Sequence, residues 1–255
     1  MTGCAWEGFF SSTQLARWQE AIALRFSCRK FQAAANIQQL SALHYAAGRL
    51  GLPGVRVELA ECDSNQLFRA IPFIESVEYA SQYMALIIDP RVPHALLHAG
   101  IAGEALVLEA TAQGLGTCWV QGTYRKGAVN IELKPGEKIA ALIPYGQPAD
   151  PQGASRRKRK PLQALCLDDP ATWPNWSYQA AEAVRAAPSA INSQPWRFSH
   201  AGDTMRLSGS GFGNLNYGIA VLHILCALHQ VPHSWRWGER EKSLLIRRKE
   251  QHDPV

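Results

Sequence analysis

Two arginines that flank a hydroxyl form the first group of side chains along the chain suited to binding an anion. Arg25, Ser27 and Arg29 stand at alternate positions in Arg-Phe-Ser-Cys-Arg, directly after an apolar pattern of helical spacing. Arginine makes charge-assisted hydrogen bonds to phosphates and carboxylates, and the hydroxyl adds a further donor. The alternative interpretation is that the arginines only complement the dipole of the helix that ends here.

A run of five basic residues at 156–160 is a second candidate anion site. The chain has 26 Lys and Arg against 21 Asp and Glu, a net charge of +5, and this run contains the whole excess. A positive charge confined to five residues favours binding of one compact anion such as a phosphate, whereas nucleic-acid-binding proteins usually carry broader basic surfaces. A solvated linker is the alternative, and a nucleic-acid contact through this run is the weakest hypothesis.

The most distinctive segment is Ala187-Pro-Ser-Ala-Ile-Asn-Ser-Gln-Pro-Trp-Arg-Phe198. Pro188 and Pro195 stiffen its backbone, and the side chains between them offer hydrogen-bond donors and acceptors within a short irregular stretch. Such a segment suits recognition of a planar heterocycle with polar edges. A capped helix entry with local side-chain turns is equally compatible with the spacing.

A glycine-rich segment, residues 113–122, follows a long apolar helical pattern. Its glycines end a helix and enter a strand, which is the reverse of the context required for dinucleotide binding. Gly122 would allow a ligand to approach the backbone closely, although an ordinary helix C-cap and turn explains the same glycines.

Hydrophobic periodicity indicates which elements position these segments. Apolar spacing predicts helices near residues 15–22, 37–50, 93–114, 176–184 and 217–230, and strands at residues 55–59, 83–88, 138–145 and 235–247. Helices and strands do not alternate regularly, so the pattern indicates an α+β fold. Residues 147–160, rich in Pro, Gly and charge, are the best candidate boundary, and we expect two halves at 1–165 and 166–255 that form one compact unit.

Composition narrows the class of protein and its environment. The chain has 255 residues, 47% of them hydrophobic, enough for a substantial core. The six cysteines are scattered without a Cys-x-x-Cys pair, so we expect free thiols and no metal site. No apolar run is long enough to span a bilayer and the start resembles no secretion signal, so we expect a cytoplasmic protein without a membrane partner.

An internal repeat connects the two halves of the sequence. Gly100-Ile-Ala102 recurs as Gly218-Ile-Ala220, and Trp119 recurs as Trp237, both 118 positions later (218 − 100 and 237 − 119). Apolar helices produce chance matches of this kind. The physical alternative is a duplicated half whose copies pack about a pseudo-two-fold axis, a dimer written as one chain.

Taken together, these segments resemble the nitroreductase family of FMN-dependent oxidoreductases. The Pro-Ser-x-x-Asn-x-Gln-Pro-Trp motif is the specific match. The weaker matches are Arg-x-Ser-x-Arg, Gly114-Leu-Gly-Thr-Cys-Trp119 with Val-Gln-Gly122, the strand Leu142-Ile-Pro-Tyr-Gly146, and Arg157-x-Arg159. The resemblance implies a nitroreductase-like fold, with a mainly antiparallel mixed sheet flanked by helices and two pseudo-symmetric halves.

The resemblance also implies which residues contact FMN. The first arginine segment and the later basic pair would hold the phosphate and ribityl chain, the Pro-Ser-x-x-Asn segment would line the flavin ring, and the backbone near Gly122 would face its reactive edge. By position in this sequence these are Arg25, Phe26, Ser27, Arg29, Trp119, Val120, Gln121, Gly122, Arg157, Arg159, Pro188, Ser189, Ala190 and Asn192. FMN itself would carry the chemistry, so no residue is assigned a catalytic role.

The order of the motifs departs from that of ordinary family members. In those, Pro-Ser-x-x-Asn follows Arg-x-Ser-x-Arg within a few tens of residues, whereas here it begins only at Pro188. In the family's homodimer each flavin lies between subunits, with the phosphate clamp from one and the ring segment from the other. A fused dimer explains the displacement, so the chain resembles the fused-dimer branch of the family and is expected to be a monomer.

Two functional hypotheses follow from this resemblance. The first is transfer of reducing equivalents from NAD(P)H through FMN to a small, aromatic or electron-poor acceptor. The alternative is a non-catalytic flavin-binding protein used for storage or sensing.

Overall fold

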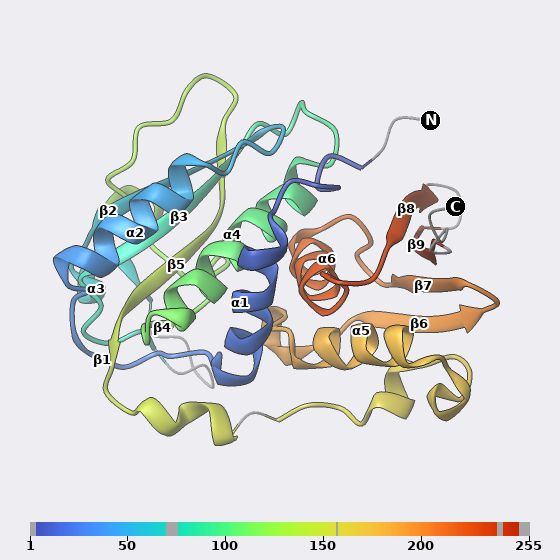
Figure 1. Cartoon of the computed structure of the whole chain (residues 1–255). Coiled ribbons are helices and arrows are strands. Elements are labelled where there is room, and N and C mark those ends of the chain that lie inside the picture. Colours follow the sequence, from blue (N-terminus) through green and yellow to red (C-terminus); the bar gives the residue numbers. More distant parts are fainter. Residues whose placement is uncertain (1–3, 70–75, 157, 239–241, 250–255) are drawn as a thin grey trace.

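The strands form two antiparallel sheets in the computed structural model, which describes residues 4–69, 76–156, 158–238 and 242–249. The first sheet, on the left in Figure 1, has the order β1 (Phe31–Ala33), β5 (Lys138–Pro148), β3 (Gln82–Ile88) and β2 (Val55–Glu61), with β4 (Gly116–Thr117) also paired to β5. The second sheet, on the right, has the order β6 (Trp196–Ala201), β7 (Thr204–Gly209), β9 (Ser243–Arg248) and β8 (His233–Gly238).

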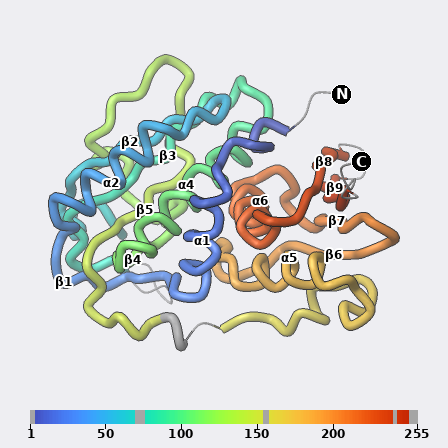
Figure 2. The backbone as a smooth tube through the Cα atoms, viewed as in Figure 1, coloured from blue at the N-terminus to red at the C-terminus, as the bar shows by residue number. Residues whose placement is uncertain are grey.

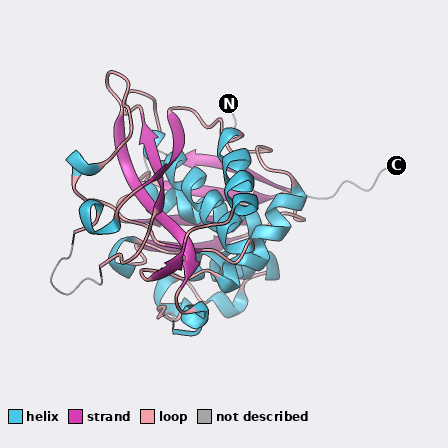
Figure 3. Cartoon of the chain, turned by 90° about the vertical axis from the view of Figure 1, so that its left-hand side faces the viewer, coloured by secondary structure: helices cyan, strands magenta, loops and turns pink. Residues whose placement is uncertain are grey.

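The first sheet is built around β3, in which every residue is buried. Its continuous apolar sequence is typical of a central strand covered on both faces, and it pairs with β5 on one side and β2 on the other. The strands twist strongly, as Figure 3 shows from that side of the chain. The strands expected near residues 55–59, 83–88 and 138–145 are thus confirmed.

The second sheet differs from the sequence-based expectation. The single strand expected at residues 235–247 is wrong, because β8 and β9 are two antiparallel strands that pair with each other. The hairpin of β6 and β7 was not predicted. Its two-residue turn contains Gly202 at φ +57, a conformation that glycine adopts without steric cost.

The two sheets share one strand order. Neighbouring strands follow the order β2, β3, β5, β4 in the first sheet and the order β6, β7, β9, β8 in the second. In each case an antiparallel pair of strands precedes an apolar helix, and the strand after that helix pairs with the next strand in the chain.

Two apolar helices, α4 (Ala95–Ala112) and α6 (Leu215–Ala227), cross between the sheets. They approach so closely that a Cβ on Gly100 would collide with the Leu215 carbonyl oxygen, and one on Gly218 would collide with the Leu97 carbonyl oxygen. The contact is reciprocal, because Leu97 and Gly100 stand 118 positions before Leu215 and Gly218 (215 − 97 and 218 − 100).

The remaining helices cover this centre. α1 (Ser12–Leu24) packs on both α4 and α6, and a capping box at Ser11 fixes where it begins. α2 (Ile37–Gly48) has a capping box at Asn36 and covers β2, while α5 (Asn175–Ala186) packs on α6. The short helix α3 (Ser64–Leu67) follows β2. All five helices expected from the sequence are present.

Of the described residues, α4 alone forms a helix long and apolar enough to cross a membrane, with mean hydropathy 1.3 over 18 residues. The fold buries 89% of that stretch, so the helix serves as a core element here.

An irregular connection joins the two sheets, running along the bottom of the view from β5 to α5 (Figure 2). It contains the short 3-10 turns Pro151–Arg156, Leu162–Leu165 and Pro170–Thr172, and a further such turn, Lys126–Ala128, precedes β5. The boundary expected between residues 165 and 166 falls within this connection.

Candidate functional site

The segment Arg25–Arg29 lies against the strand that follows α4. Arg25 ends α1, with its backbone N–H donating to the carbonyl of Ala21. Ser27 forms a parallel bridge with Thr117, and the Cys28 N–H donates to the Thr117 carbonyl over 2.8 Å. The hydroxyl-bearing residue Ser27 is exposed, so this pairing presents it at the surface beside β4.

The connection after β5 folds back onto the same segment. The N–H of Ala149 donates to the Lys30 carbonyl over 3.0 Å, and a Cβ on Gly153 would collide with the ring of Phe26. Phe26 therefore packs directly on the backbone that leads into the basic run.

The basic run is bonded in turn to the Pro-Ser-x-x-Asn segment. The Arg159 guanidinium donates to Oδ1 of Asn192 over 3.1 Å, and the Asn192 amide donates to the Lys158 carbonyl over 3.1 Å. Lys160 adds two bonds, from its N–H to Oε1 of Gln194 over 3.0 Å and from Nζ to the Ser193 carbonyl over 2.7 Å. A stretch from the first half of the chain is thereby fixed to one from the second.

The Pro-Ser-x-x-Asn segment itself is strained. Ile191, Asn192 and Gln194 all have positive φ, at 47, 54 and 47 degrees. Asparagine tolerates this region, but a β-branched isoleucine there is unusual, and this isoleucine is 89% exposed. The turn is held by a hydrogen bond from the Gln194 N–H to the Ser189 hydroxyl over 2.9 Å.

The segment from Trp119 to Gly122 leaves the core and reaches the surface. Val120 is buried and pairs with Leu142 through both of its backbone groups. Gln121 and Gly122 are exposed, and Gly122 has φ +82 with no other atom within 4 Å of where a Cβ would stand. This stretch of backbone therefore offers an open approach to a flat ligand.

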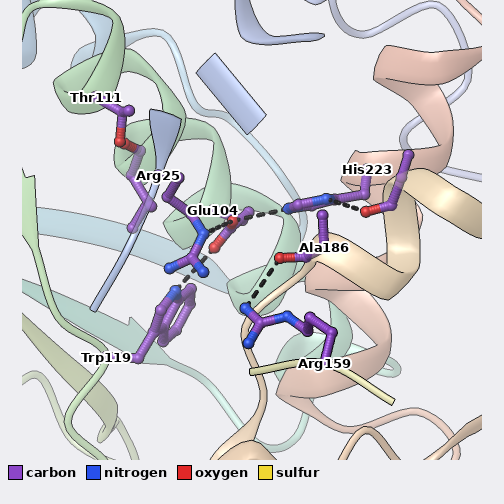
Figure 4. Close-up of polar contacts among 9 residues, drawn as sticks. Arg25, Glu104, Thr111, Trp119, Arg159, Ala186 and His223 are labelled. Carbon is purple, nitrogen blue, oxygen red and sulfur yellow. Dashed lines mark hydrogen bonds and ion pairs between the residues drawn. The ribbon is translucent and has the colours of Figure 1, made fainter. Parts of the chain in front are cut away.

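A buried polar network lies behind these segments (Figure 4). The carboxylate of Glu104, on α4, accepts hydrogen bonds from Trp119 Nε1 over 2.8 Å and lies 2.9 Å from Nε2 of His223 on α6. His223 Nδ1 is 2.7 Å from the Ala183 carbonyl on α5. Arg159 bonds the carbonyl of Ala186 at the end of that helix over 3.1 Å.

Arg25 belongs to this network and lies in the interior. Its side chain is 2% exposed, and its Nε is 3.9 Å from Oε1 of Glu104. Burial lowers the pKa of the guanidinium, and the nearby Glu104 carboxylate opposes that shift. Among the described residues, Nε and Nη2 are buried and have no hydrogen-bond partner, so the group retains donors for a further acceptor.

The residues predicted to contact FMN differ in burial. Ser27, Gln121, Gly122, Ala190 and Asn192 are exposed, Phe26, Arg29, Trp119, Arg159 and Ser189 are half-buried, and Arg25, Val120 and Pro188 are buried. Arg157 lies outside the described residues. No group of three or more potential metal ligands occurs within the described ranges.

These placements test whether the residues suit a phosphorylated planar cofactor. An exposed hydroxyl at Ser27 and the guanidinium groups of Arg29 and Arg159 suit the phosphate end, and the open backbone at Gly122 suits the ring. The unpartnered donors of Arg25 add a buried positive charge behind them. The residue types and exposures fit FMN.

Glu104 and His223 were not predicted from the sequence to be parts of the site. Both stand in largely apolar helices, which is a detectable signal, since a charged side chain at a core position needs a partner. The partner could not be identified, because 119 positions separate the two residues.

Comparisons with known proteins show the family and the fold of the chain. The family model described as "Putative TM nitroreductase" matches residues 18–228. A nitroreductase structure from Thermotoga maritima is similar over 90% of this chain and 92% of that chain, with 21% identity and a TM-score of 0.65. At this identity the likeness shows the fold, which is nitroreductase-like.

Two shorter structures match with lower scores. One, from Desulfovibrio desulfuricans in complex with FMN, has 20% identity and a TM-score of 0.47, covering 62% of this chain and 98% of that chain. The other, from Desulfitobacterium hafniense with bound FMN, has 18% identity and a TM-score of 0.44, covering 52% of this chain and 90% of that chain. No curated protein matches the chain.

Proposed function

The chain belongs to the family described as "Putative TM nitroreductase", and from this premise we propose that it is an FMN-dependent oxidoreductase. In this proposal it passes reducing equivalents from NAD(P)H through FMN to a small, aromatic or electron-poor acceptor. Two of the similar nitroreductase structures contain FMN. We place this activity in the cytoplasm.

The observation that carries the proposal is the convergence of the four predicted FMN-contact segments. Ser27 pairs with Thr117 just before Trp119, Phe26 packs on Gly153 before the basic run, and Arg159 bonds Asn192. Residues up to 165 positions apart in the sequence (192 − 27) thereby border one region.

The protein's part in the reaction would be binding, orientation and electrostatics. When bound, FMN would supply the redox chemistry by accepting and passing on electrons. Ser27, Arg29 and Arg159 would hold the phosphate, and the backbone of Gln121 and Gly122 would hydrogen-bond one edge of the ring. Arg25 would favour negative charge in the site through its buried guanidinium.

Pro188, Ser189, Ala190 and Asn192 would line the ring from the second half of the chain. The Asn192 amide accepts a hydrogen bond from Arg159 and donates one to the Lys158 carbonyl, so it ties the proposed ring segment to the basic run. Gly122 and Ile191 are both exposed, and we expect donor and acceptor to bind in turn beside these residues.

We propose also that the chain is a single-chain pseudo-dimer with one FMN site. The reciprocal contact of Gly100 and Gly218, the shared strand order of the two sheets, and the separate origin of clamp and ring segment support this. An interface already inside one chain makes a monomer the expected solution state.

The absorption spectrum of the purified chain, followed by release and identification of the chromophore, tests the cofactor. Steady-state oxidation of NADH and NADPH with a quinone and a nitroaromatic then tests the activity. We expect FMN and acceptor-dependent oxidation. Bound FMN without oxidation of either donor by any acceptor would instead identify a flavin-binding protein, and failure to bind FMN would reject both hypotheses.

A further inference from the structure

A buried acid–histidine pair joins the two halves of the chain. Glu104 and His223 are both fully buried, and their side chains meet where α4 crosses α6. A buried charged or polar side chain at such a crossing is costly unless it is paired and hydrogen-bonded. The hydrogen bonds of the pair must therefore offset the cost of burying it.

The hydrogen-bond geometry fixes the number of protons on the pair. His223 Nδ1 lies 2.7 Å from the Ala183 carbonyl oxygen, which can only accept, so Nδ1 carries a proton. His223 Nε2 lies 2.9 Å from Oε1 of Glu104. A second proton must lie between Nε2 and Oε1, since two lone pairs at this distance would repel each other. The pair therefore holds one proton more than a neutral imidazole and a carboxylate would.

The contacts of the Glu104 carboxylate favour its ionised form and therefore a proton on the imidazole. Trp119 Nε1 donates to Oε2 of Glu104 over 2.8 Å, and the Arg25 guanidinium is 3.9 Å from Oε1, so a donor and a positive charge both favour the carboxylate. Within the described residues, the thiols of Cys118 and Cys226 also interact electrostatically with Arg25 and Glu104 respectively. Burial and the Glu104 carboxylate raise the pKa of Cys226, which keeps that thiol neutral.

We propose that Glu104 holds His223 as a buried imidazolium and that the two act as positioning residues for the FMN site. Glu104 fixes Trp119, the start of the segment that ends at Gly122, and faces Arg25. His223 fixes α5 through Ala183, and α5 leads into the Pro-Ser-x-x-Asn segment.

The two positive charges of Arg25 and His223 exceed the single negative charge of Glu104, so the network carries a net positive charge behind the site. A fixed positive charge in a buried region favours negative charge nearby, including that of a bound phosphate or of a reduced ring. This part of the inference rests on the proposed function, whereas the protonation of His223 does not.

Nitrogen NMR of the full chain labelled in its histidines tests the protonation directly. At pH 8 free imidazole is neutral, but we expect both ring nitrogens of His223 to be protonated. In Glu104→Gln the ring should become neutral, with its proton on Nδ1, because the new amide can donate to Nε2. A neutral His223 ring in the wild-type chain at pH 8 would overturn the proposal.

Glu109→Gln is the matched control for this experiment. Glu109 lies on the same helix, is also buried, and bonds Trp18 and Arg17 rather than His223. The His223 signals should therefore remain those of the wild-type chain. Loss of the imidazolium in this variant too would show that the signal reports general disturbance of α4, and would count against the pairing.

The effect on flavin is measured as FMN affinity and reduction potential in His223→Leu and Glu104→Gln. His223→Leu removes a positive charge, and we expect the FMN Kd to rise about tenfold and the potential to become more negative. Glu104→Gln removes one charge of each sign when His223 loses its proton, so its potential should change less. Equal potentials in all three proteins would reject the electrostatic role.

The two proposals fail in different ways. If His223 is an imidazolium but the chain binds no FMN, the inference on the buried pair holds and the proposed function is rejected. If the chain binds FMN but His223 is neutral, the proposed function can hold and the inference on His223 is rejected. If His223→Leu does not fold, the NMR result on the wild-type chain still decides the protonation.

Discussion

At the scale of single residues, the site depends on charged side chains whose environments differ sharply. Arg25 is buried beside Glu104, whereas Arg159 is half-buried and bonds the surface residue Asn192. The sequence does not distinguish these two arginines. Only Arg159 can exchange its protein partner for a ligand without leaving a buried carboxylate unpaired.

We expect Arg159→Ala to weaken binding of FMN far more than that of riboflavin, which lacks the phosphate. A charge-assisted bond to phosphate is worth about 1.5–3 kcal/mol, so the FMN Kd should rise at least about tenfold. Arg159→Lys should lose less because it keeps the charge. Titration of both flavins measures this, and equal weakening of the two would reject phosphate binding by Arg159.

Ile191 tests whether the strained turn costs stability. Asparagine tolerates positive φ better than a β-branched residue, so Ile191→Asn should raise the free energy of unfolding by about 1 kcal/mol. Ile191→Val keeps the β-branch and should give no gain. Denaturant unfolding compares the three proteins, and a Val variant as stable as the Asn variant would show that the φ of +47 carries no cost.

At the scale of elements, the long apolar segments were predictable and the short ones were not. The helix at Ala95–Ala112 and the strand at Gln82–Ile88 have apolar runs that only a core position explains. The strands β6 and β7 have six residues each, and an alternation of apolar and polar residues this short is difficult to recognise beside the preceding motif. The burial of Arg25 could not be predicted, because its partner Glu104 comes from another helix.

The crossing of α4 and α6 requires glycine on both helices. Gly218→Ala places a methyl group against the Leu97 carbonyl and should destabilise the fold by about 3 kcal/mol. Gly48→Ala, in the last turn of α2, has no atom within 4 Å of the new Cβ and should be neutral or slightly stabilising. Thermal unfolding of both variants measures the difference, and similar stabilities would contradict the close approach.

A bidentate ion pair ties the edge strand β2 to the turn before β5. Arg56 donates to both oxygens of Glu137 over 2.9 and 2.7 Å, and these bonds lower the pKa of Glu137 to about 2. The folded-state pKa is below the unfolded value of about 4.3, so the pair stabilises the fold above that pH. This stabilisation is lost as the pH falls towards 2.

Unfolding free energies measured between pH 5 and pH 2 check this pair. Glu137→Gln should flatten the decline seen in the wild-type chain, while Glu20→Gln, at an exposed position, should leave it unchanged. An unaltered decline in Glu137→Gln would mean that the pair does not form in solution.

At the scale of the whole molecule, the order of the motifs acquires a physical meaning. Arg25–Arg29 and Pro188–Asn192 lie far apart in the sequence, and the connection after β5 contacts both, through Gly153 at Phe26 and through Arg159 at Asn192. A two-subunit enzyme achieves such a site by symmetry and therefore forms it twice. In this chain Arg-x-Ser-x-Arg and Pro-Ser-x-x-Asn each occur once, so one site is expected.

The stoichiometry of flavin, measured together with molar mass, tests this account most directly. Flavin absorbance against protein concentration gives the number of FMN per chain, and light scattering on the same sample gives the mass. We predict one FMN per chain and the mass of a monomer, 28.1 kDa plus the cofactor. Two FMN per chain, or an obligate dimer that releases its flavin on dissociation, would contradict the single-chain pseudo-dimer.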